Sequence, residues 1–297
     1  MNPRFTVSPN LALEGRSNFP CFQRPLSKAQ YDRLCRLIRG QVIEMSLRAG
    51  TPHLASSLSC VELIAAMYGG ILSIDPENPN DPARDRFILS KGHAAAALYS
   101  ALAFFGFFAP EELLTFASNG SDLAEQPSPN CRPGVEAATG SLGHGLSLGL
   151  GMSLASRITD IPFKTYVLIS DGECNEGSVW EAAMLAPAKK LGSLTVIVDF
   201  NKWQATDRSE EVMAISPLKE KFIAFGWDAF EVDGHNIEEI LSVLQRAPRG
   251  VNETPLAIIA HTIKGKGVSF MEDDNNWHYR IPTEEEYKRA KEELRLE

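Results

Sequence analysis

The sequence predicts an α/β fold in which helices cover both faces of a doubly wound parallel sheet. Short apolar runs alternate with helix-length segments along the chain and no internal repeat is present, a pattern typical of successive strand–helix–strand units. The clearest unit lies in the middle of the chain. There the apolar runs 166–169 and 194–198 are separated by the segment 176–190, which is long enough to cross between two parallel strands.

The N-terminal part of the chain divides into an extension and the start of the folded domain. Residues 1–26 are largely polar and contain prolines, and we interpret them as an extension that wraps a partner; residues 27–297 form the domain. Ser27 is expected to cap a helix whose apolar residues keep helical spacing until Gly50 ends it. A capping box of Ser59 and Glu62 predicts a second helix, through residue 68.

The remaining elements are predicted from the same patterns: short apolar runs indicate strands, and apolar residues at helical spacing indicate helices. In order along the chain, we expect a buried strand at 86–90, a helix at 94–105, a loop at 119–133, a helix at 146–158, the central unit, a helix at 218–225, a strand at 229–232, a helix at 237–246, a strand at 256–261 and a charged, solvated helix from Thr283 onward.

Polar residues follow both strands of the central unit. Asp171 and Gly172 come after the first strand, and Asn201 comes after the second. Because the carboxyl ends of parallel strands meet at the sheet edge where α/β proteins bind ligands, we expect these side chains to lie close together there. A carboxylate and an amide oxygen suit Mg²⁺ or Ca²⁺, which complete their coordination shells with phosphate oxygens. The pair therefore predicts a metal ion that holds a diphosphate.

Composition narrows the class of partner and the compartment. The chain has 297 residues, of which 44% are hydrophobic, enough for a large core, and a formal net charge of −9. That charge argues against nucleic acid or an anionic membrane as partner. The five cysteines form no CxxC pair, and we interpret them as reduced thiols, most of them buried. Since no apolar run has the length of a membrane span and no signal-peptide pattern is present, we expect a cytoplasmic protein.

The central unit resembles the thiamin diphosphate signature of transketolases and related enzymes. The resemblance includes the stretches SDGECNEG and VIVDFNKW and extends from about residue 27 to about residue 280, although the first position of the signature, usually Gly, is Ser170 here. It implies a thiamin diphosphate-binding fold in which Asp171, Asn201 and the backbone carbonyl of Trp203 hold Mg²⁺. The backbone amides around Gly172, close to a helix start, would face the phosphates.

The glycine-rich stretch TGSLGHG at 139–145 is a second part of this resemblance. It does not match GxGxxG and it follows a loop rather than a strand, which argues against an NAD-binding dehydrogenase. Glycines at such a place allow the backbone to approach a ligand closely. A similar stretch lies against the cofactor in transketolases, which implies that Gly140 and Leu142 lie beside thiamin diphosphate.

Three histidines lie in segments that resemble transketolase motifs. His93, in LSKGH, matches a histidine that contacts the diphosphate. His53, in AGTPH, matches one that contacts the sugar near the reacting carbon. His278, in NNWH, resembles a histidine near both the diphosphate and the substrate. The resemblance implies that His53 and His278 are catalytic and serve in proton transfers.

The chain departs from the transketolase pattern just before its PGVE stretch. Transketolases usually have Gly-His-Pro-Glu or Gly-His-Pro-Asp there, with a histidine that touches the donor's terminal hydroxyl, whereas this chain reads Glu125-Gln126-Pro127-Ser128. Gln126 exchanges hydrogen bonds but carries no proton at neutral pH. We expect it to contact substrate, which leaves open a donor or acceptor other than an ordinary pentose phosphate.

Glu176 has two interpretations. It stands at the expected start of a helix, where a carboxylate is favoured by the helix dipole. The resemblance implies instead a subunit interface, where a glutamate at this place belongs to an acidic network that links two active sites. We expect Glu176 to be an interface residue.

The resemblance implies that this chain is the N-terminal subunit of a split transketolase. Transketolase chains are about twice as long, so a C-terminal subunit would supply the pyrimidine-binding domain, in an expected α₂β₂ assembly. Together they would transfer a two-carbon ketol unit from a ketose, which we expect to be phosphorylated, to an aldose. The alternatives are the α subunit of a 2-oxoacid dehydrogenase, a natural-product two-carbon transferase, and a noncatalytic scaffold, against which the intact Asp171 and Asn201 argue.

Overall fold

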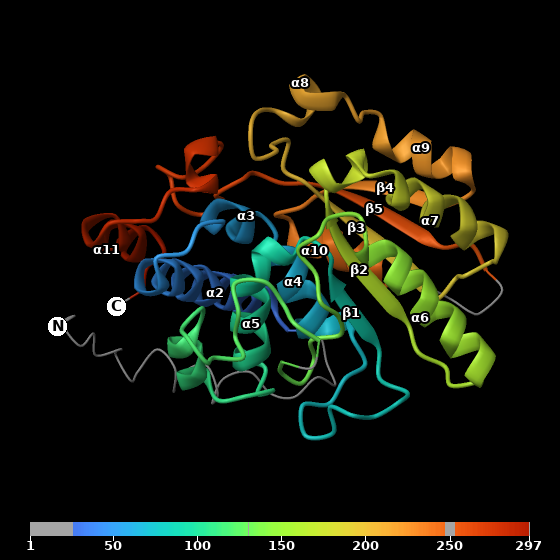
Figure 1. Ribbon diagram of the computed structural model, residues 1–297, viewed down its shortest axis with the longest axis horizontal. Coiled ribbons are helices and arrows are strands. Elements are labelled where there is room, and N and C mark those ends of the chain that lie inside the picture. The colour runs from blue at the N-terminus through green and yellow to red at the C-terminus, as the bar shows by residue number, and fades with distance from the viewer. Residues whose placement is uncertain (1–25, 130, 247–252, 297) are drawn as a thin grey trace.

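The computed structural model describes residues 26–129, 131–246 and 253–296, and it confirms the α/β fold. A five-stranded, entirely parallel sheet runs through the domain in the order β1-β2-β3-β5-β4 (Figure 1). The strands are β1 (Arg86–Leu89), β2 (Thr165–Ser170), β3 (Leu194–Phe200), β4 (Asp228–Asp233) and β5 (Leu256–His261). Each lies within one residue of its expected range or extends it by one or two.

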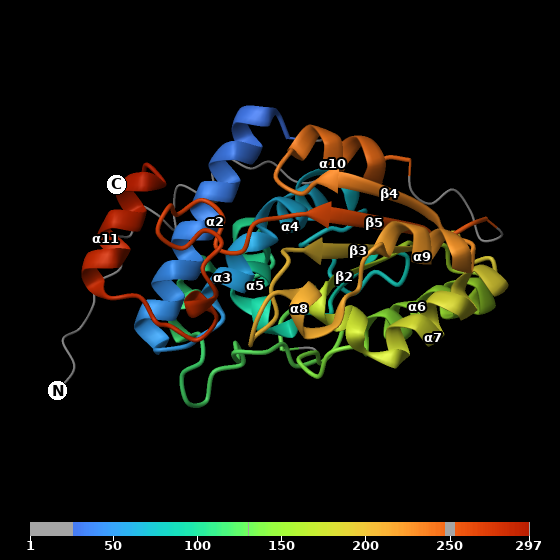
Figure 2. The same cartoon turned by 90° about the horizontal axis from the view of Figure 1, so that it is seen from above.

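Helices cover both faces of this sheet, as expected (Figure 2). The longer ones are α2 (Lys28–Ala49), α5 (Ala95–Phe104), α6 (Gly145–Thr159), α7 (Gly177–Ala188), α9 (Leu218–Phe225), α10 (Ile237–Leu244) and α11 (Glu284–Glu293). The shorter ones are α3 (Leu54–Ser59), α4 (Val61–Ala66) and α8 (Ser209–Met213), a π-helix at Met67–Ile71, and 3-10 helices at Gly92–Ala94, Pro110–Thr115, Gly172–Asn175 and Asn275–His278.

Alternation along the strands divides the apolar side chains between two cores. On β2, Tyr166 and Leu168 belong to the core made with α2, α4, α5 and α10. Val167 and Ile169 belong to the opposite core, made with α6, α7 and α9. Because both faces of the central strands are covered, every residue of β2 and β3 is buried and most of them are apolar, as is usual for parallel strands.

The first helix begins and ends as the sequence predicts. The Ser27 side chain caps α2 in a reciprocal capping box with Gln30, and Gly50 ends the helix in the left-handed conformation with φ 66°. These two local signals, together with the apolar spacing between them, are sufficient to define the bounds of α2.

The expected capping box of Ser59 and Glu62 is wrong. Ser59 ends α3, and Cys60 rather than Ser59 is the N-cap of α4. The Ser59 hydroxyl donates instead to the backbone oxygen of Ser56 at 3.0 Å and to Asp199 Oδ2 at 2.7 Å. Glu62 accepts two hydrogen bonds from the Arg39 guanidinium, at 2.7 and 2.8 Å. Both side chains therefore join distant segments, which a pattern of neighbouring residues does not reveal.

The C-terminal helix α11 is less solvated than expected. Its residue Ala290 and the following Leu294 are buried, and α11 packs on α2. A Cβ added at Gly40 of α2 would lie only 2.3 Å from Leu296 Cδ1. The charged residues of α11 lie on one side of the helix. A few small or apolar residues on the other side pack against the domain.

Three further expectations concern the N-terminal extension, the cysteines and membrane spans. The proposed N-terminal extension falls on residues outside the described part, apart from Leu26. Among the described cysteines, Cys35, Cys60 and Cys174 are buried as expected, and Cys131 is half-buried. None of the helices in the described ranges combines the length and apolar character that a membrane span requires.

Gly149 is a point of close contact between α6 and the sheet, and we expect its replacement by alanine to destabilise the domain. A Cβ there would lie 2.4 Å from Val167 Cγ2, so overpacking of about 1–3 kcal/mol should exceed the gain in helix propensity. Gly151 on the same helix has open space at its Cβ position. Gly151→Ala should therefore be neutral or stabilising by up to about 1 kcal/mol. Urea unfolding of both variants checks this contrast; equal effects would contradict the packing argument.

Candidate cofactor and substrate site

The expected metal ligands stand at the carboxyl ends of two adjacent strands. Ser170, the last residue of β2, pairs in register with Asp199 of β3, so Asp171 and Asn201 follow their strands at the same edge of the sheet. Asp171 is fully buried. Its Oδ1 accepts the Gly172 backbone N–H at 2.9 Å, and its Oδ2 accepts the Lys202 backbone N–H and the Ser209 hydroxyl, each at 2.8 Å.

The Asp171 carboxylate is suited to a cation. Burial raises its pKa to about 7, and the nearby Asp199 also raises it, against the lowering effect of the Ser209 hydroxyl and the backbone N–H donors. Within the described residues no lysine, arginine or histidine forms a salt bridge with it, although it lies in the interior. A divalent ion would supply the missing positive charge and favour the ionised form.

Asn201 is oriented by a second carboxylate. Its amide Nδ2 donates to Asp199 Oδ2 at 3.3 Å, and its Oδ1 accepts the Trp203 backbone N–H at 3.0 Å. The amide nitrogen and the amide oxygen of Asn201 thus have different partners, and the oxygen faces the loop that follows β3. The side chain of Asn201 is buried, so solvent does not compete for either position.

Trp203 fastens the same loop to the segment after β5. The Arg208 guanidinium lies 3.7 Å from the centre of the Trp203 ring, and the indole N–H donates to Asp273 Oδ1 at 2.8 Å. Arg208 also donates two hydrogen bonds to the Asp273 carboxylate, both at 2.7 Å. This arrangement restrains the backbone of Trp203, whose carbonyl is the third expected metal ligand.

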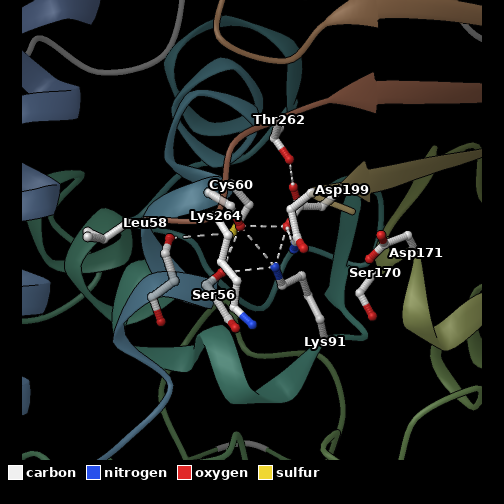
Figure 3. Close-up of polar contacts among 12 residues, drawn as sticks. Ser56, Leu58, Cys60, Lys91, Ser170, Asp171, Asp199, Thr262 and Lys264 are labelled. Atoms are coloured by element: carbon white, nitrogen blue, oxygen red, sulfur yellow. Dashed lines mark hydrogen bonds and ion pairs between the residues drawn. The ribbon is translucent and has the colours of Figure 1, made fainter. Parts of the chain in front are cut away.

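A buried ion pair lies close to these ligands, and one of its members, Asp199, contacts Asn201 (Figure 3). Lys91 and Asp199 are fully buried and contact each other directly. Asp199 also accepts hydrogen bonds from Ser59, at 2.7 Å, and from Thr262 on its other side, while Lys91 donates to the Ser56 backbone oxygen at 2.9 Å. Burial would raise the pKa of Asp199, but Lys91 and these hydrogen bonds hold it below its ordinary value. The pair joins α3, β3 and the segments after β1 and β5.

The glycine-rich stretch lies against the loop that follows β1. A Cβ added at Gly92 would lie 2.6 Å from the Thr139 carbonyl carbon and 2.7 Å from the Gly140 nitrogen. Gly140 itself adopts φ 135°, and a Cβ there would lie 1.8 Å from Gln126 Oε1. The structure therefore brings Gln126 and Gly140 together, with the LSKGH segment of His93 beside them; Leu142 is half-buried two residues on.

The three histidines from distant segments form one cluster. The centre of the His53 ring lies 5.6 Å from that of His93 and 5.2 Å from that of His278, and the last two are 6.2 Å apart. The backbone N–H of His53 donates to the His278 backbone oxygen at 2.8 Å. His53 Nδ1 lies 3.0 Å from Glu125 Oε1. Sequence reasoning assigned no role to Glu125.

Two of these histidines are held in the neutral state. Burial, with Lys91 and the neighbouring imidazoles, holds the pKa of His93 well below its ordinary value. Burial also lowers the pKa of His278 to about 3, with Lys264 as the next cause. The Lys264 ammonium donates to His278 Nδ1 at 3.0 Å and to Asn275 Oδ1 at 2.6 Å. Burial lowers the pKa of Lys264 itself to about 8.

The two glutamates after β2 have contrasting positions. Glu173 is fully buried and accepts the Gly143 backbone N–H at 2.8 Å, the Ser170 backbone N–H at 3.2 Å and the Ser90 hydroxyl. It thereby ties the glycine-rich stretch to the ends of β1 and β2. Glu176, the expected interface residue, is exposed at the N-cap of α7 and forms no capping hydrogen bond. Its role remains a prediction.

The residues present fit a metal-bound diphosphate. Carboxylate, amide and carbonyl oxygens suit Mg²⁺ or Ca²⁺, which take further ligands from phosphate or water. In the described ranges, no group of three or more histidine, cysteine or acidic side chains could hold a metal ion. The expected site has only one such side chain, Asp171. Gly172 begins a 3-10 turn directly after Asp171, and its neighbourhood offers backbone N–H groups to an anion.

A family model and a solved structure identify the family of this chain. Residues 31–297 match the family model described as the thiamine diphosphate binding domain of transketolase. The transketolase of Campylobacter jejuni shares the fold with a TM-score of 0.84 at 29% identity, over 92% of this chain and 44% of its own. The fold is therefore that of the thiamine diphosphate binding domain of transketolase, and the chain belongs to the transketolase family.

Relatives of similar length are named as single subunits of transketolases. The chain is 41% identical to one from the apulose-4-phosphate transketolase of Phocaeicola vulgatus, over 86% of this chain and 90% of the relative. It is 40% identical to SqwG, a subunit of the 6-deoxy-6-sulfo-D-fructose transketolase of a Clostridium species, over 92% and 99%. Human transketolase is 38% identical over 81% of this chain, which spans only 38% of that protein.

Proposed function

We propose that this chain is the N-terminal subunit of a two-component transketolase that moves a two-carbon ketol unit from a ketose to an aldose. The observation that carries the proposal is the meeting of Asp171 and Asn201 at one sheet edge, in a domain that also gathers His53, His93 and His278 into one cluster. The relatives of similar length are named as subunits, which supports the division of the enzyme into two chains.

Each group in the site has a task in this proposal. Asp171, Asn201 and the Trp203 carbonyl hold Mg²⁺, or Ca²⁺, on the diphosphate, and Gly140, Leu142 and Gly172 allow the backbone to approach the cofactor. When bound, thiamin diphosphate supplies the electron sink for breaking a carbon–carbon bond beside a carbonyl. His93 and His278 would contact the diphosphate. His53 and His278 exchange protons with substrate hydroxyls, and Gln126 contacts the sugar.

The partner is a C-terminal transketolase subunit with the pyrimidine-binding domain. An assembly of two copies of each chain fits the symmetry of most oligomers, with Glu176 of α7 at an interface and the cytoplasm as the location. The relatives are named for different sugars, and Gln126 replaces the histidine of the usual transketolase pattern. We therefore propose a donor or acceptor other than an ordinary pentose phosphate. We propose neither nucleic acid nor membrane as a partner.

Calorimetric titration of thiamin diphosphate tests the cofactor part of this proposal. We expect metal-dependent binding when the chain is mixed with its C-terminal partner, and at least tenfold weaker binding to the chain alone, because one half of the site is then missing. Titrations with Mg²⁺, with Ca²⁺ and with chelator define the metal requirement. Binding that is equally tight with chelator would contradict the metal-held diphosphate.

A further inference from the structure

The contact between Glu125 and His53 is a feature that the transketolase pattern does not contain. Glu125 stands where that pattern has glycine, in a loop far from His53 in the sequence, and its Oε1 lies 3.0 Å from His53 Nδ1. Both side chains are partly shielded, with exposed fractions of 38% for Glu125 and 19% for His53. We propose that Glu125 is a positioning residue that keeps the proton of His53 on Nδ1, so that Nε2 accepts a proton from a substrate hydroxyl. This inference rests on the proposed function.

Hydrogen-bond chemistry determines the tautomer. An ionised carboxylate only accepts, so Nδ1 of His53 is the donor in this contact. In a neutral imidazole the other nitrogen then carries the lone pair. The ring is also held from its backbone, because His53 adopts the left-handed conformation with φ 69° and its N–H donates to the His278 backbone oxygen. Ring position and proton position are thus both specified.

The neighbouring histidine has the opposite tautomer. Lys264 approaches His278 Nδ1 at 3.0 Å, and an ammonium group only donates, so Nδ1 of His278 is an acceptor and its proton resides on Nε2. The two ring centres are 5.2 Å apart. Glu125 and Lys264 therefore make the Nε2 of one imidazole a hydrogen-bond acceptor and the Nε2–H of the next a hydrogen-bond donor, so the two rings offer opposite hydrogen-bonding roles to a substrate.

The charge of Glu125 matters after the proton has moved. When a substrate hydroxyl loses its proton, the O–H bond breaks, an N–H bond forms at Nε2, and His53 becomes an imidazolium. The carboxylate then forms a charge-assisted hydrogen bond with the positive ring. His93 has no such partner among the described residues, and Lys91 and Lys264 disfavour positive charge on His93 and His278. His53 is therefore the member of the cluster whose positive form has a carboxylate beside it.

Nitrogen-15 NMR of the chain alone tests the contact without any catalytic assay. The His53 ring signals are assigned by their loss in His53→Asn. We expect the Nδ1–H tautomer in the native chain and in Glu125→Gln, whose amide oxygen still accepts, and a shift toward Nε2–H in Glu125→Leu. Glu112→Gln is the matched control: it removes a similarly exposed acid that pairs with Arg132 instead, and should leave His53 unchanged. An Nε2–H tautomer in the native chain would overturn the proposal, as would a His53 spectrum unaffected by Glu125→Leu.

Kinetics of the reconstituted enzyme test the consequence. Glu125→Leu should lower kcat by about 10- to 100-fold with little change in KM. Glu125→Gln should recover most of that loss, and Glu112→Gln should match the native enzyme. A changed tautomer with unchanged kcat would refute the positioning role. An inactive native complex would count against the transketolase itself, whereas the NMR result decides the Glu125 contact independently.

Discussion

Replacing Asp171 with asparagine is expected to weaken strongly the metal-dependent binding of thiamin diphosphate by the assembled enzyme. The substitution removes the negative ligand from a site whose other expected oxygens are neutral. Loss of even an outer-shell group costs about 10- to 100-fold in metal affinity, so removal of a direct ligand should cost about 100-fold or more. Isothermal titration of cofactor with Mg²⁺ into the native and variant complexes measures the difference.

The same substitution should leave the fold intact. A buried carboxylate at Asp171 is unfavourable without a cation, which is reflected in its pKa of about 7, so removal of the charge offsets the hydrogen bonds that asparagine replaces imperfectly. We expect a change in unfolding free energy within about 1 kcal/mol for the metal-free chain. Asp160→Asn, the same change at an exposed site, is the control. Unaltered cofactor affinity in Asp171→Asn would contradict its assignment as a ligand.

Replacing Lys91 with methionine is expected to cause the largest loss of stability. Methionine leaves the Asp199 carboxylate buried without its cation, and removal of one partner from a buried pair typically costs about 3–5 kcal/mol. The companion variant Lys91→Met/Asp199→Asn removes both charges and keeps hydrogen-bonding atoms near Ser59 and Thr262. Since no isolated charge remains, we expect it to recover at least about half of the lost stability.

Urea unfolding of the single and double variants measures this recovery. Lys189→Met, which removes an exposed lysine, serves as the control and should change stability by less than about 0.5 kcal/mol. A double variant that is no more stable than Lys91→Met would show that Lys91 acts through something other than the charge of Asp199. A Lys91→Met protein as stable as the native chain would contradict the account of the buried pair.

The positions of the strands and helices followed from the sequence wherever a local period decided them. The apolar runs of β2 and β3 are buried on both faces, so their identity as strands was plain, and Ser27 and Gly50 defined α2 by local capping alone. The Ser59 and Glu62 pair shows the limit of such signals. Its spacing matches a capping box, but the two side chains contact Asp199 and Arg39, which are distant in sequence.

Without the family resemblance, the sequence predicted which candidate residues lie together at strand ends, but not which ones meet from separate loops. Asp171 and Asn201 were found because parallel strands place their carboxyl ends together. Lys91, Glu173 and Lys264 were missed because their burial depends on three or more segments packing at once. A lysine or glutamate in a loop is ordinarily solvated. Glu125 was missed for the same reason, since its partner His53 lies on another segment.

Transfer of a labelled two-carbon unit tests the central claim most directly. The chain and its C-terminal partner would be mixed with thiamin diphosphate, Mg²⁺, an aldose acceptor and a panel of ketoses labelled with carbon-13 at the first two carbons, and the products followed by NMR. We predict that label enters a new ketose only when both subunits, cofactor and metal are present. Absence of transfer from every ketose, by a complex shown to assemble and to bind the cofactor, would contradict the assignment as a transketolase.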